Sequence, residues 1–333
     1  LVSDQKPESF LILFFLLKLS SIIYPKLFHI NNYKIDTSLF DHSLHATIVD
    51  DFERKFADYV GADYACSVSS ATNAIFLSLL NKDVTVKVPS VIPPVVLNAI
   101  INSGNNIEFI DNVDWVGDSY TLHDFGEYKI IDSAQKVEKN QFIKEASDKD
   151  LMIFSFYPTK PIGSLDGGII VSNDYEKIKW FKAAVMNGME YAANNWEREI
   201  KFPGWKMYMS SVQAYIATEN FYKLEEKKTR LKEIRQRYNF EFGLSNTSDH
   251  LYRIQVENRN NFIKKMKECG ISCGIHYAAT HLLGPYRKYV TGDLPQSEII
   301  EKTTVSIPFN EMLSDDNLNY IVSSVKKYKQ GDL

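Results

Sequence analysis

Two predicted strands enclose the connection that most constrains how this chain can fold. Residues 151–156 and 168–171 are short, mostly apolar runs of the kind that form buried strands. The connection between them is rich in glycine and proline and carries Lys160. A lysine near apolar surface loses hydration and becomes easier to deprotonate, and a neutral amine attacks carbonyl groups. The more common alternative is a loop lysine whose ammonium reaches water, so the rest of the chain has to decide.

Strands and helices alternate from about residue 45 onward. This alternation is typical of an α/β fold, in which a mostly parallel sheet is covered by helices on both faces. The other predicted strands lie at residues 64–68, 84–88, 107–110 and 129–131, and the predicted helices at 45–59, 73–80 and 211–236.

The pattern changes after residue 247, where a strand, a helix, a strand edge and a closing helix indicate a smaller α+β domain. We therefore predict three parts: an atypical N-terminal segment at 1–45, a large domain at 46–246 and a small C-terminal domain at 247–333.

Composition excludes several classes of protein. The net charge of −4 and the lack of a long basic run give no support to nucleic-acid binding. Three cysteines, with their uneven spacing, fit neither a disulfide framework nor a closed zinc site, so no metal is predicted. The simplest compartment for such a chain is the reducing cytoplasm.

The first 30 residues contain an apolar run at 10–24 that is interrupted by Lys18. The run falls short of the roughly 20 apolar residues that span a bilayer, and neither a basic start nor a cleavage site marks it as a signal peptide. We expect a helix buried against the body or a partner subunit, with attachment to a membrane surface as the alternative.

Short hydroxyl side chains follow the strand at 64–68 and open the next helix, at Ser69 to Thr72. The free N–H groups at a helix start, together with the helix dipole, make such a junction an anion site. A plain N-cap without a ligand is the more common arrangement for this motif alone.

Asp132 stands at the carboxyl end of the strand at 129–131, where open α/β sheets bind their ligands. Its carboxylate is suited to keep a proton on a heteroaromatic nitrogen, and Gln135 follows three residues later. An ordinary helix cap is again the alternative. An anion cradle, a carboxylate and the amine of Lys160, each at a strand end, are together what pyridoxal phosphate requires.

With these motifs the chain resembles the DegT/DnrJ/EryC1/StrS sugar aminotransferases, which are fold-type I pyridoxal-phosphate enzymes. The resemblance runs from about Val49 to Tyr328. It is carried by Asp51–Val60, Ser69–Ala74, Ile131–Gln135, Ser155–Lys160, Ser211–Ala214, Gly274–Tyr277 and Gly292–Pro295.

The resemblance implies roles for particular residues. Lys160 would join the cofactor covalently and later move protons, Asp132 would pair with the pyridine nitrogen, and Gln135 would lie near the ring hydroxyl. Two further sets are implied. The phosphate would be held by Ala71, Thr72 and Ser155, and the sugar nucleotide would lie near His276 and Tyr277, although His276 is equally explained as a structural residue.

In this family the site is completed across a homodimer interface, here by the segment 204–209, in which Lys206 replaces the usual Asn. Other departures are Ala71 for the glycine of the phosphate loop and the lack of a stacking aromatic in residues 89–95. Ile92 or Pro93 would have to supply the apolar face instead. The stretch from 111 to 132 is also too short for the family's usual strand–helix–strand unit, and residues 1–45 do not match the family's N-terminus.

The resemblance predicts an aminotransferase that uses pyridoxal 5′-phosphate and moves an amino group, expected from glutamate, to a nucleotide-linked keto-sugar. A related sugar dehydratase would lack the Schiff-base lysine, so Lys160 argues against it. The second alternative is a catalytically silent relative that binds a sugar nucleotide or a partner, including at a membrane surface through residues 10–24.

Overall fold

The computed structural model describes residues 25–30, 33, 35–36, 38, 47–191 and 198–329. The apolar run at 10–24 and most of the predicted segment 1–45 lie outside these residues. Among the helices that are described, none combines the length and the apolar character needed to cross a membrane.

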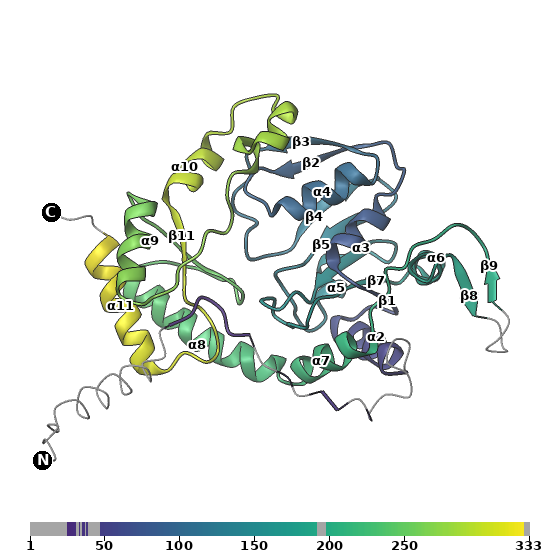
Figure 1. Cartoon of the computed structure of the whole chain (residues 1–333), viewed down its shortest axis with the longest axis horizontal. Coiled ribbons are helices and arrows are strands. Elements are labelled where there is room, and N and C mark those ends of the chain that lie inside the picture. The colour runs from purple at the N-terminus through teal and green to yellow at the C-terminus, as the bar shows by residue number, and fades with distance from the viewer. Residues whose placement is uncertain are drawn as a thin grey trace, which may run out of the picture.

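A five-stranded sheet forms the centre of the molecule, in the order β1-β7-β6-β5-β4 (Figure 1). Its strands are β1 (Tyr64–Val68), β7 (Gly168–Ser172), β6 (Leu151–Ser155), β5 (Lys129–Asp132) and β4 (Tyr120–Asp124). The strands β2 (Thr85–Pro89) and β3 (Asn106–Ile110) pair in parallel as a separate two-stranded sheet.

The strand directions are more mixed than the sequence predicts, although the α/β class itself is confirmed. Within the five-stranded sheet only β5 and β6 run in parallel, and the other neighbours are antiparallel. A short connection explains one of these pairs, because a parallel crossover needs about a dozen residues and usually a helix. The link from β4 to β5 has no room for one, so these two strands form an antiparallel hairpin. The link from β6 to β7 contains no helix and is the loop of Lys160.

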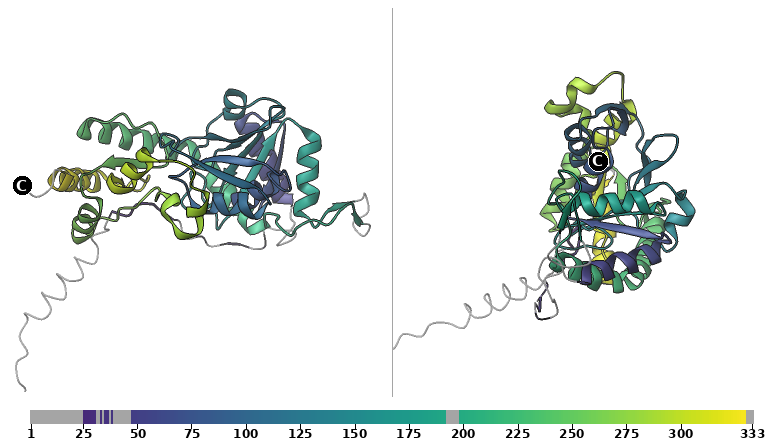
Figure 2. Two further views of the ribbon diagram at one scale, coloured as in Figure 1. Left: turned by 90° about the horizontal axis from the view of Figure 1, so that it is seen from above. Right: turned by 90° about the vertical axis from the view of Figure 1, so that its right-hand side faces the viewer.

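Both faces of the sheet are covered, because successive residues of a strand point to opposite sides. In β6, Leu151 and Ile153 enter one apolar core, and Met152 and Phe154 enter the other. The first core is covered by α3 (Ala71–Ser78), α4 (Pro94–Asn102) and α6 (Tyr175–Val185), and the second by α2 (Thr47–Val60), α5 (Gln141–Glu145) and α7 (Ser211–Tyr222) (Figure 2).

The prediction of one long helix at 211–236 is wrong in one respect. The segment forms two helices, α7 and α8 (Leu224–Phe242), which are separated at Lys223. The two parts serve different cores. Ala214 and Ala217 of α7 pack under the large sheet, whereas Leu231 and Ile234 of α8 pack in the C-terminal core. A single straight helix would not reach both cores. The predicted domain boundary between 246 and 247 is a separate point and stays a prediction.

The C-terminal core lies between helices and a two-stranded sheet of β10 (Tyr252–Gln255) and β11 (Thr304–Ile307). The helices around it are α8, α9 (Arg259–Glu268) and α11 (Asp315–Lys329). In α10 (Pro295–Thr303), Ile300 packs against the first core of the five-stranded sheet instead. The short η2 (Thr280–Leu282) is followed by η3 (Gly284–Tyr289), which contacts β3. The described residues 25–30 run along this core, where the backbone of Leu27 accepts a hydrogen bond from Phe309. Part of the N-terminal segment thus belongs to the body of the molecule.

Candidate active site

The loop that carries Lys160 is held at several points. Gly163 lies so close to another part of the loop that a Cβ there would come within 2.4 Å of a backbone oxygen. The side-chain amide of Asn220 in α7 donates to the Gly163 carbonyl oxygen. The ammonium of Lys227 in α8 donates to the carbonyl oxygen of Pro161 at 3.2 Å. The loop therefore holds the partly buried Lys160 at the end of β6.

Asp132 ends β5 and is only 4% exposed. Its carboxylate accepts two hydrogen bonds, from the Ala134 N–H at 2.9 Å and from the Tyr120 hydroxyl at 3.0 Å. Tyr120 opens β4 and lies opposite Asp132 in the strand register. The shortened stretch between 111 and 132 thus contributes a strand whose first side chain orients the predicted cofactor-binding carboxylate.

Lys160 and Asp132 act on each other electrostatically. Burial lowers the pKa of the Lys160 ammonium to about 8, and the negative charge of Asp132 opposes this shift. Burial raises the pKa of Asp132, while the Ala134 N–H, Tyr120 and the charge of Lys160 oppose that shift. Lys160 is therefore far easier to deprotonate than an ordinary lysine, as a nucleophile or a general base must be.

This lowered pKa predicts how cofactor uptake depends on pH. Only the neutral amine attacks an aldehyde, so the rate of covalent uptake should rise about tenfold per pH unit below pH 7 and level off above pH 8. Rapid-mixing absorbance of cofactor-free protein with pyridoxal phosphate measures this rate. A rate that still rises steeply between pH 9 and 10 would mean that Lys160 has the pKa of a solvated lysine.

The predicted phosphate cradle is brought together at the start of α3. Ser155 and Gly168 are register partners on β6 and β7. A Cβ at Gly168 would lie 2.6 Å from the backbone nitrogen of Ala71, so a side chain there would fill the space at the helix start. The N–H groups of Ala71 and Thr72 are in the first helical turn, where the helix offers no acceptor. Ser70 caps this helix and leaves those donors available for an anion.

The apolar wall predicted from Ile92 and Pro93 has an aromatic neighbour that the sequence did not identify. Ile92 is fully buried, and Pro93 is the N-cap of α4. The indole of Trp115 donates to the Val91 carbonyl oxygen at 3.1 Å and stacks on Tyr277, with ring centroids 6.2 Å apart. An aromatic ring from the shortened stretch therefore lies against the loop that lacks one.

His276 and His250 lie close enough to Lys160 for its positive charge to lower their pKa values. Burial, together with the charge of Lys160, lowers the pKa of His276 to about 4, and its Nδ1 is within 2.9 Å of the Ser306 hydroxyl. His250, which the sequence reading missed, is also buried, and its pKa lies well below the usual range for the same reasons. Phe28 packs against both imidazoles, with ring centroids at 5.6 Å in each case. Both histidines are therefore neutral near pH 7.

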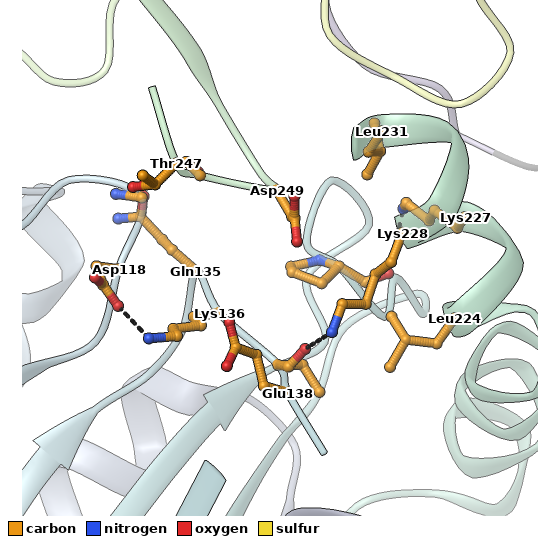
Figure 3. A pocket seen from close by; sticks show the side chains of 14 residues that line it. Asp118, Gln135, Lys136, Glu138, Leu224, Lys227, Lys228, Leu231, Thr247 and Asp249 are labelled. Atoms are coloured by element: carbon orange, nitrogen blue, oxygen red, sulfur yellow. Dashed lines mark hydrogen bonds and ion pairs between the residues drawn. The ribbon is translucent and has the colours of Figure 1, made fainter. Parts of the chain in front are cut away.

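Gln135 lies to one side of this cluster, in a pocket between the loop after β5 and α8 (Figure 3). Its side-chain oxygen accepts a hydrogen bond from the Gly117 N–H at 2.9 Å. Its neighbour Lys136 forms an ion pair with Asp118 at 2.7 Å in the same pocket. The predicted contact of Gln135 with a ring hydroxyl stays a prediction.

Lys206 is exposed at the surface, in an isolated bridge with Met186. The next residue, Met207, accepts a hydrogen bond from the Ser69 N–H at 2.7 Å, so the segment runs beside the cradle of its own chain. The role of Lys206 in a partner's site stays a prediction.

The residues present fit pyridoxal phosphate. The helix start offers donors for a phosphate, Asp132 is a buried carboxylate for a ring nitrogen, and Lys160 is an amine of lowered pKa. Within the described ranges, no group of three or more His, Cys, Asp and Glu side chains is placed to hold a metal ion. The fold and these side chains define a fold-type I pyridoxal-phosphate enzyme.

The chain belongs to the DegT/DnrJ/EryC1/StrS aminotransferase family, whose model matches residues 41–118 and 130–326. The resemblance predicted from the sequence is thereby confirmed, and with it the family's cofactor, pyridoxal 5′-phosphate. The match is interrupted at residues 119–129, which contain β4.

Two curated relatives and one solved structure illustrate the similarity. The spore coat polysaccharide biosynthesis protein SpsC of Bacillus subtilis is 27% identical, over 85% of this chain and 90% of its own. A UDP-4-amino-4,6-dideoxy-N-acetyl-beta-L-altrosamine transaminase of Campylobacter jejuni is 25% identical, over 84% and 91%. Spr1654 of Streptococcus pneumoniae, named as a sugar aminotransferase and solved in its PLP form, is 19% identical with a TM-score of 0.74, over 91% and 98%.

Proposed function

We propose that this protein is a pyridoxal-phosphate-dependent aminotransferase that moves an amino group from glutamate to a nucleotide-linked keto-sugar. The observation that carries the proposal is that Lys160 and the buried Asp132 act on each other electrostatically, while the helix start at Ala71 lies against Gly168, the register partner of Ser155 at the end of β6. The Campylobacter jejuni relative, which is a transaminase of a UDP-linked sugar, supports the substrate class.

Each side chain then has a defined task. The N–H groups of Ala71 and Thr72, with Ser155, would hold the phosphate, and Asp132, whose two donors favour its anionic form against the effect of burial, would hold the ring nitrogen. When bound, pyridoxal phosphate supplies an electron-withdrawing ring that makes the neighbouring C–H bond acidic. The neutral Lys160 amine would take a proton from the donor's carbon, and the resulting ammonium would return it.

The catalytically silent alternative is disfavoured by the same pair. A relative that only binds would have no need for a partly buried amine whose pKa is lowered to about 8 and which interacts electrostatically with a buried carboxylate. A binding role at a membrane through residues 10–24 concerns residues that the structure does not describe.

A substrate panel tests the proposal. Purified protein with bound cofactor is mixed with glutamate, and the visible absorption band should bleach within seconds to minutes. Addition of keto-sugar nucleotides should restore the band only for the true acceptor, with the amino-sugar identified by mass spectrometry. Protein that takes up no cofactor would contradict the proposal, and restoration by simple keto acids alone would contradict the sugar acceptor.

We also propose that the active enzyme is a homodimer with a shared site. The segment 204–209 lies beside the cradle, and Tyr208 and Met209 line a hollow between α2, β1 and α6. The adjacent hairpin of β8 (Met189–Tyr191) and β9 (Arg198–Ile200) projects from the body, with Ile200 70% exposed (Figures 1 and 2). An exposed apolar side chain on a projecting hairpin is suited to pack against a second chain.

The expected mass in solution is accordingly twice that of one chain. Light scattering coupled to size-exclusion chromatography, run at micromolar concentration, measures it, with activity assayed in the same fractions. A monomer with full activity would contradict the shared site.

A further inference from the structure

A buried carboxylate supports the strand that leads into the predicted phosphate cradle. Glu53 of α2 is only 7% exposed, which is unusual for a glutamate. Its Oε1 accepts two hydrogen bonds from Ser67 of β1, one from the backbone N–H at 2.6 Å and one from the hydroxyl at 2.7 Å. Ser67 is the last residue but one of β1, and the motif from Ser69 to Thr72 begins two residues later. Glu53 therefore holds the chain just before it enters the cradle.

The position of β1 explains why an acceptor is needed there. β1 is the first strand in the order of the five-stranded sheet, so one of its sides is an edge of the described sheet. N–H groups on such a side recur at every second residue and need partners other than a neighbouring strand. The Ser67 N–H bonds Glu53, and the Ser69 N–H donates to the Met207 carbonyl oxygen at 2.7 Å. One carboxylate and one carbonyl group thus take the place of a neighbouring strand along the approach to Ala71.

Short contacts close the turn between β1 and α3, so its shape depends on where β1 ends. The Ser69 hydroxyl accepts a hydrogen bond from the side-chain amide of Asn73 at 2.9 Å. On the other side, the start of α3 packs against Gly168 of β7, where a Cβ would lie 2.6 Å from the Ala71 nitrogen. A closely packed turn transmits displacements, so a shift of Ser67 would move the N–H groups that are predicted to face the phosphate.

Lys182 of α6 balances the charge of Glu53. Its ammonium lies 2.7 Å from Oε2 of the carboxylate, while its side chain is 48% exposed. Burial raises the pKa of Glu53, and the charge of Lys182 and the two donors of Ser67 oppose that shift. A carboxylate without a counter-charge would repel a phosphate bound nearby, and the ion pair reduces this repulsion. A strong acceptor can therefore stand close to an anion site.

We propose that Glu53 is a positioning residue for the cofactor's phosphate, because through Ser67 it sets the direction in which β1 delivers the N–H groups of Ala71 and Thr72. The proposal rests on the cofactor site of the proposed function, and it concerns binding rather than amino transfer. The position of the acceptor oxygen should then matter more than its charge. Glu53→Asp keeps the charge but withdraws the oxygen by one methylene group, whereas Glu53→Gln keeps an oxygen within reach of Ser67.

The experiment compares pyridoxal 5′-phosphate with pyridoxal, which has the same ring and aldehyde but no phosphate. Full-length protein freed of cofactor is titrated with each compound, and the visible band measures the affinity. Wild type is compared with Glu53→Asp, Glu53→Gln and, as the matched control, Asp150→Ala. Asp150 is a carboxylate, 4% exposed, that accepts from the N–H groups of Lys129 at 2.7 Å and Ser147 at 2.8 Å, at the end of β6 opposite to Ser155. Melting temperatures are recorded for all four proteins.

Glu53→Asp should bind pyridoxal phosphate about 10-fold more weakly than wild type, the effect of losing a charge-assisted hydrogen bond, and bind pyridoxal within about twofold. Glu53→Gln should bind both compounds within about threefold of wild type, since its oxygen replaces the lost acceptor. Asp150→Ala should melt at a lower temperature, because two buried N–H groups lose their acceptor, and keep the wild-type preference for the phosphorylated compound.

Equal losses of both compounds in Glu53→Asp would show a merely structural role and overturn the proposal. Unchanged affinity of Glu53→Asp for pyridoxal phosphate would overturn it as well, as would a loss in Glu53→Gln as large as that in Glu53→Asp. Wild type that binds both compounds equally well would contradict the cradle and the proposal together. A loss confined to the phosphorylated compound, in a protein that does not transaminate, would support the proposal while contradicting the proposed function.

Discussion

Lys160→Ala should reduce turnover by about 10⁴-fold or more, because it removes both the covalent attachment point and the general base. The visible band of attached cofactor should disappear, while the helix start at Ala71 and the carboxylate of Asp132 remain to hold free cofactor. Absorbance spectroscopy and the coupled glutamate assay measure the two effects. Borohydride reduction of wild type should place the cofactor label on the peptide that contains Lys160.

The same substitution should not destabilise the fold at neutral pH. The pKa of Lys160 is lowered to about 8 in the folded protein from 10.5 for an ordinary lysine. Between these pH values the unfolded chain binds more protons, so this group makes stability rise with pH there and opposes folding below it. Lys160→Ala should therefore melt no lower than wild type at pH 7, which separates lost chemistry from lost structure.

Lys232→Ala is the matched control, since Lys232 is an exposed lysine of α8. It should keep the band, the label and the activity. A Lys160→Ala protein that still turned over at more than a few per cent of the wild-type rate would contradict the assignment. So would a borohydride label on any other lysine.

The parts of the site that the sequence revealed are those encoded locally. Asp132 and Lys160 each follow an apolar strand directly, and strand ends meet at one edge of a sheet, so their proximity could be inferred from order alone. Ser155 and Ala71 could be paired in the same way. Their common neighbour Gly168 explains the arrangement, because only a residue without a side chain fits against the helix start.

Residues that depend on contacts distant in sequence were missed. The alternation of Tyr120-Thr-Leu-His-Asp is a usable strand signal, yet nothing local shows that its first residue faces Asp132. Trp115 and His250 likewise gain their roles only when segments distant in the sequence come together. Glu53 reads as one of several acidic residues on the predicted helix at 45–59, and its bonds to Ser67 are a property of the folded chain.

The break between α7 and α8 had no clear sequence signal either. Glu and Lys recur on every side of α8, so its periodicity is weak, and no Pro or Gly marks Lys223. The two helices separate because Leu224 packs in the second core of the five-stranded sheet, whereas Leu231 and Ile234 pack in the C-terminal core. Packing, rather than helix propensity, determines the boundary.

Asp132→Asn should lower turnover by about 10²–10³-fold, the loss typical of removing one fixed electrostatic group from a transition state. The change keeps the shape, and an amide oxygen can still accept from the Ala134 N–H. Cofactor should therefore still attach to Lys160, so the visible band persists while the reaction slows. This combination distinguishes Asp132 from Lys160, whose replacement removes both.

The pH dependence of cofactor uptake by Asp132→Asn provides a second, independent test of the effect of Asp132 on Lys160. The negative charge of Asp132 raises the pKa of Lys160 against the effect of burial, so its removal should lower that pKa further below about 8. The plateau in cofactor uptake should then begin at lower pH than in wild type. Asp124→Asn, in the exposed part of the same hairpin, should change neither turnover nor this profile. Full activity in Asp132→Asn, or an uptake profile that moves to higher pH, would show that Asp132 does not act on Lys160 as the geometry requires.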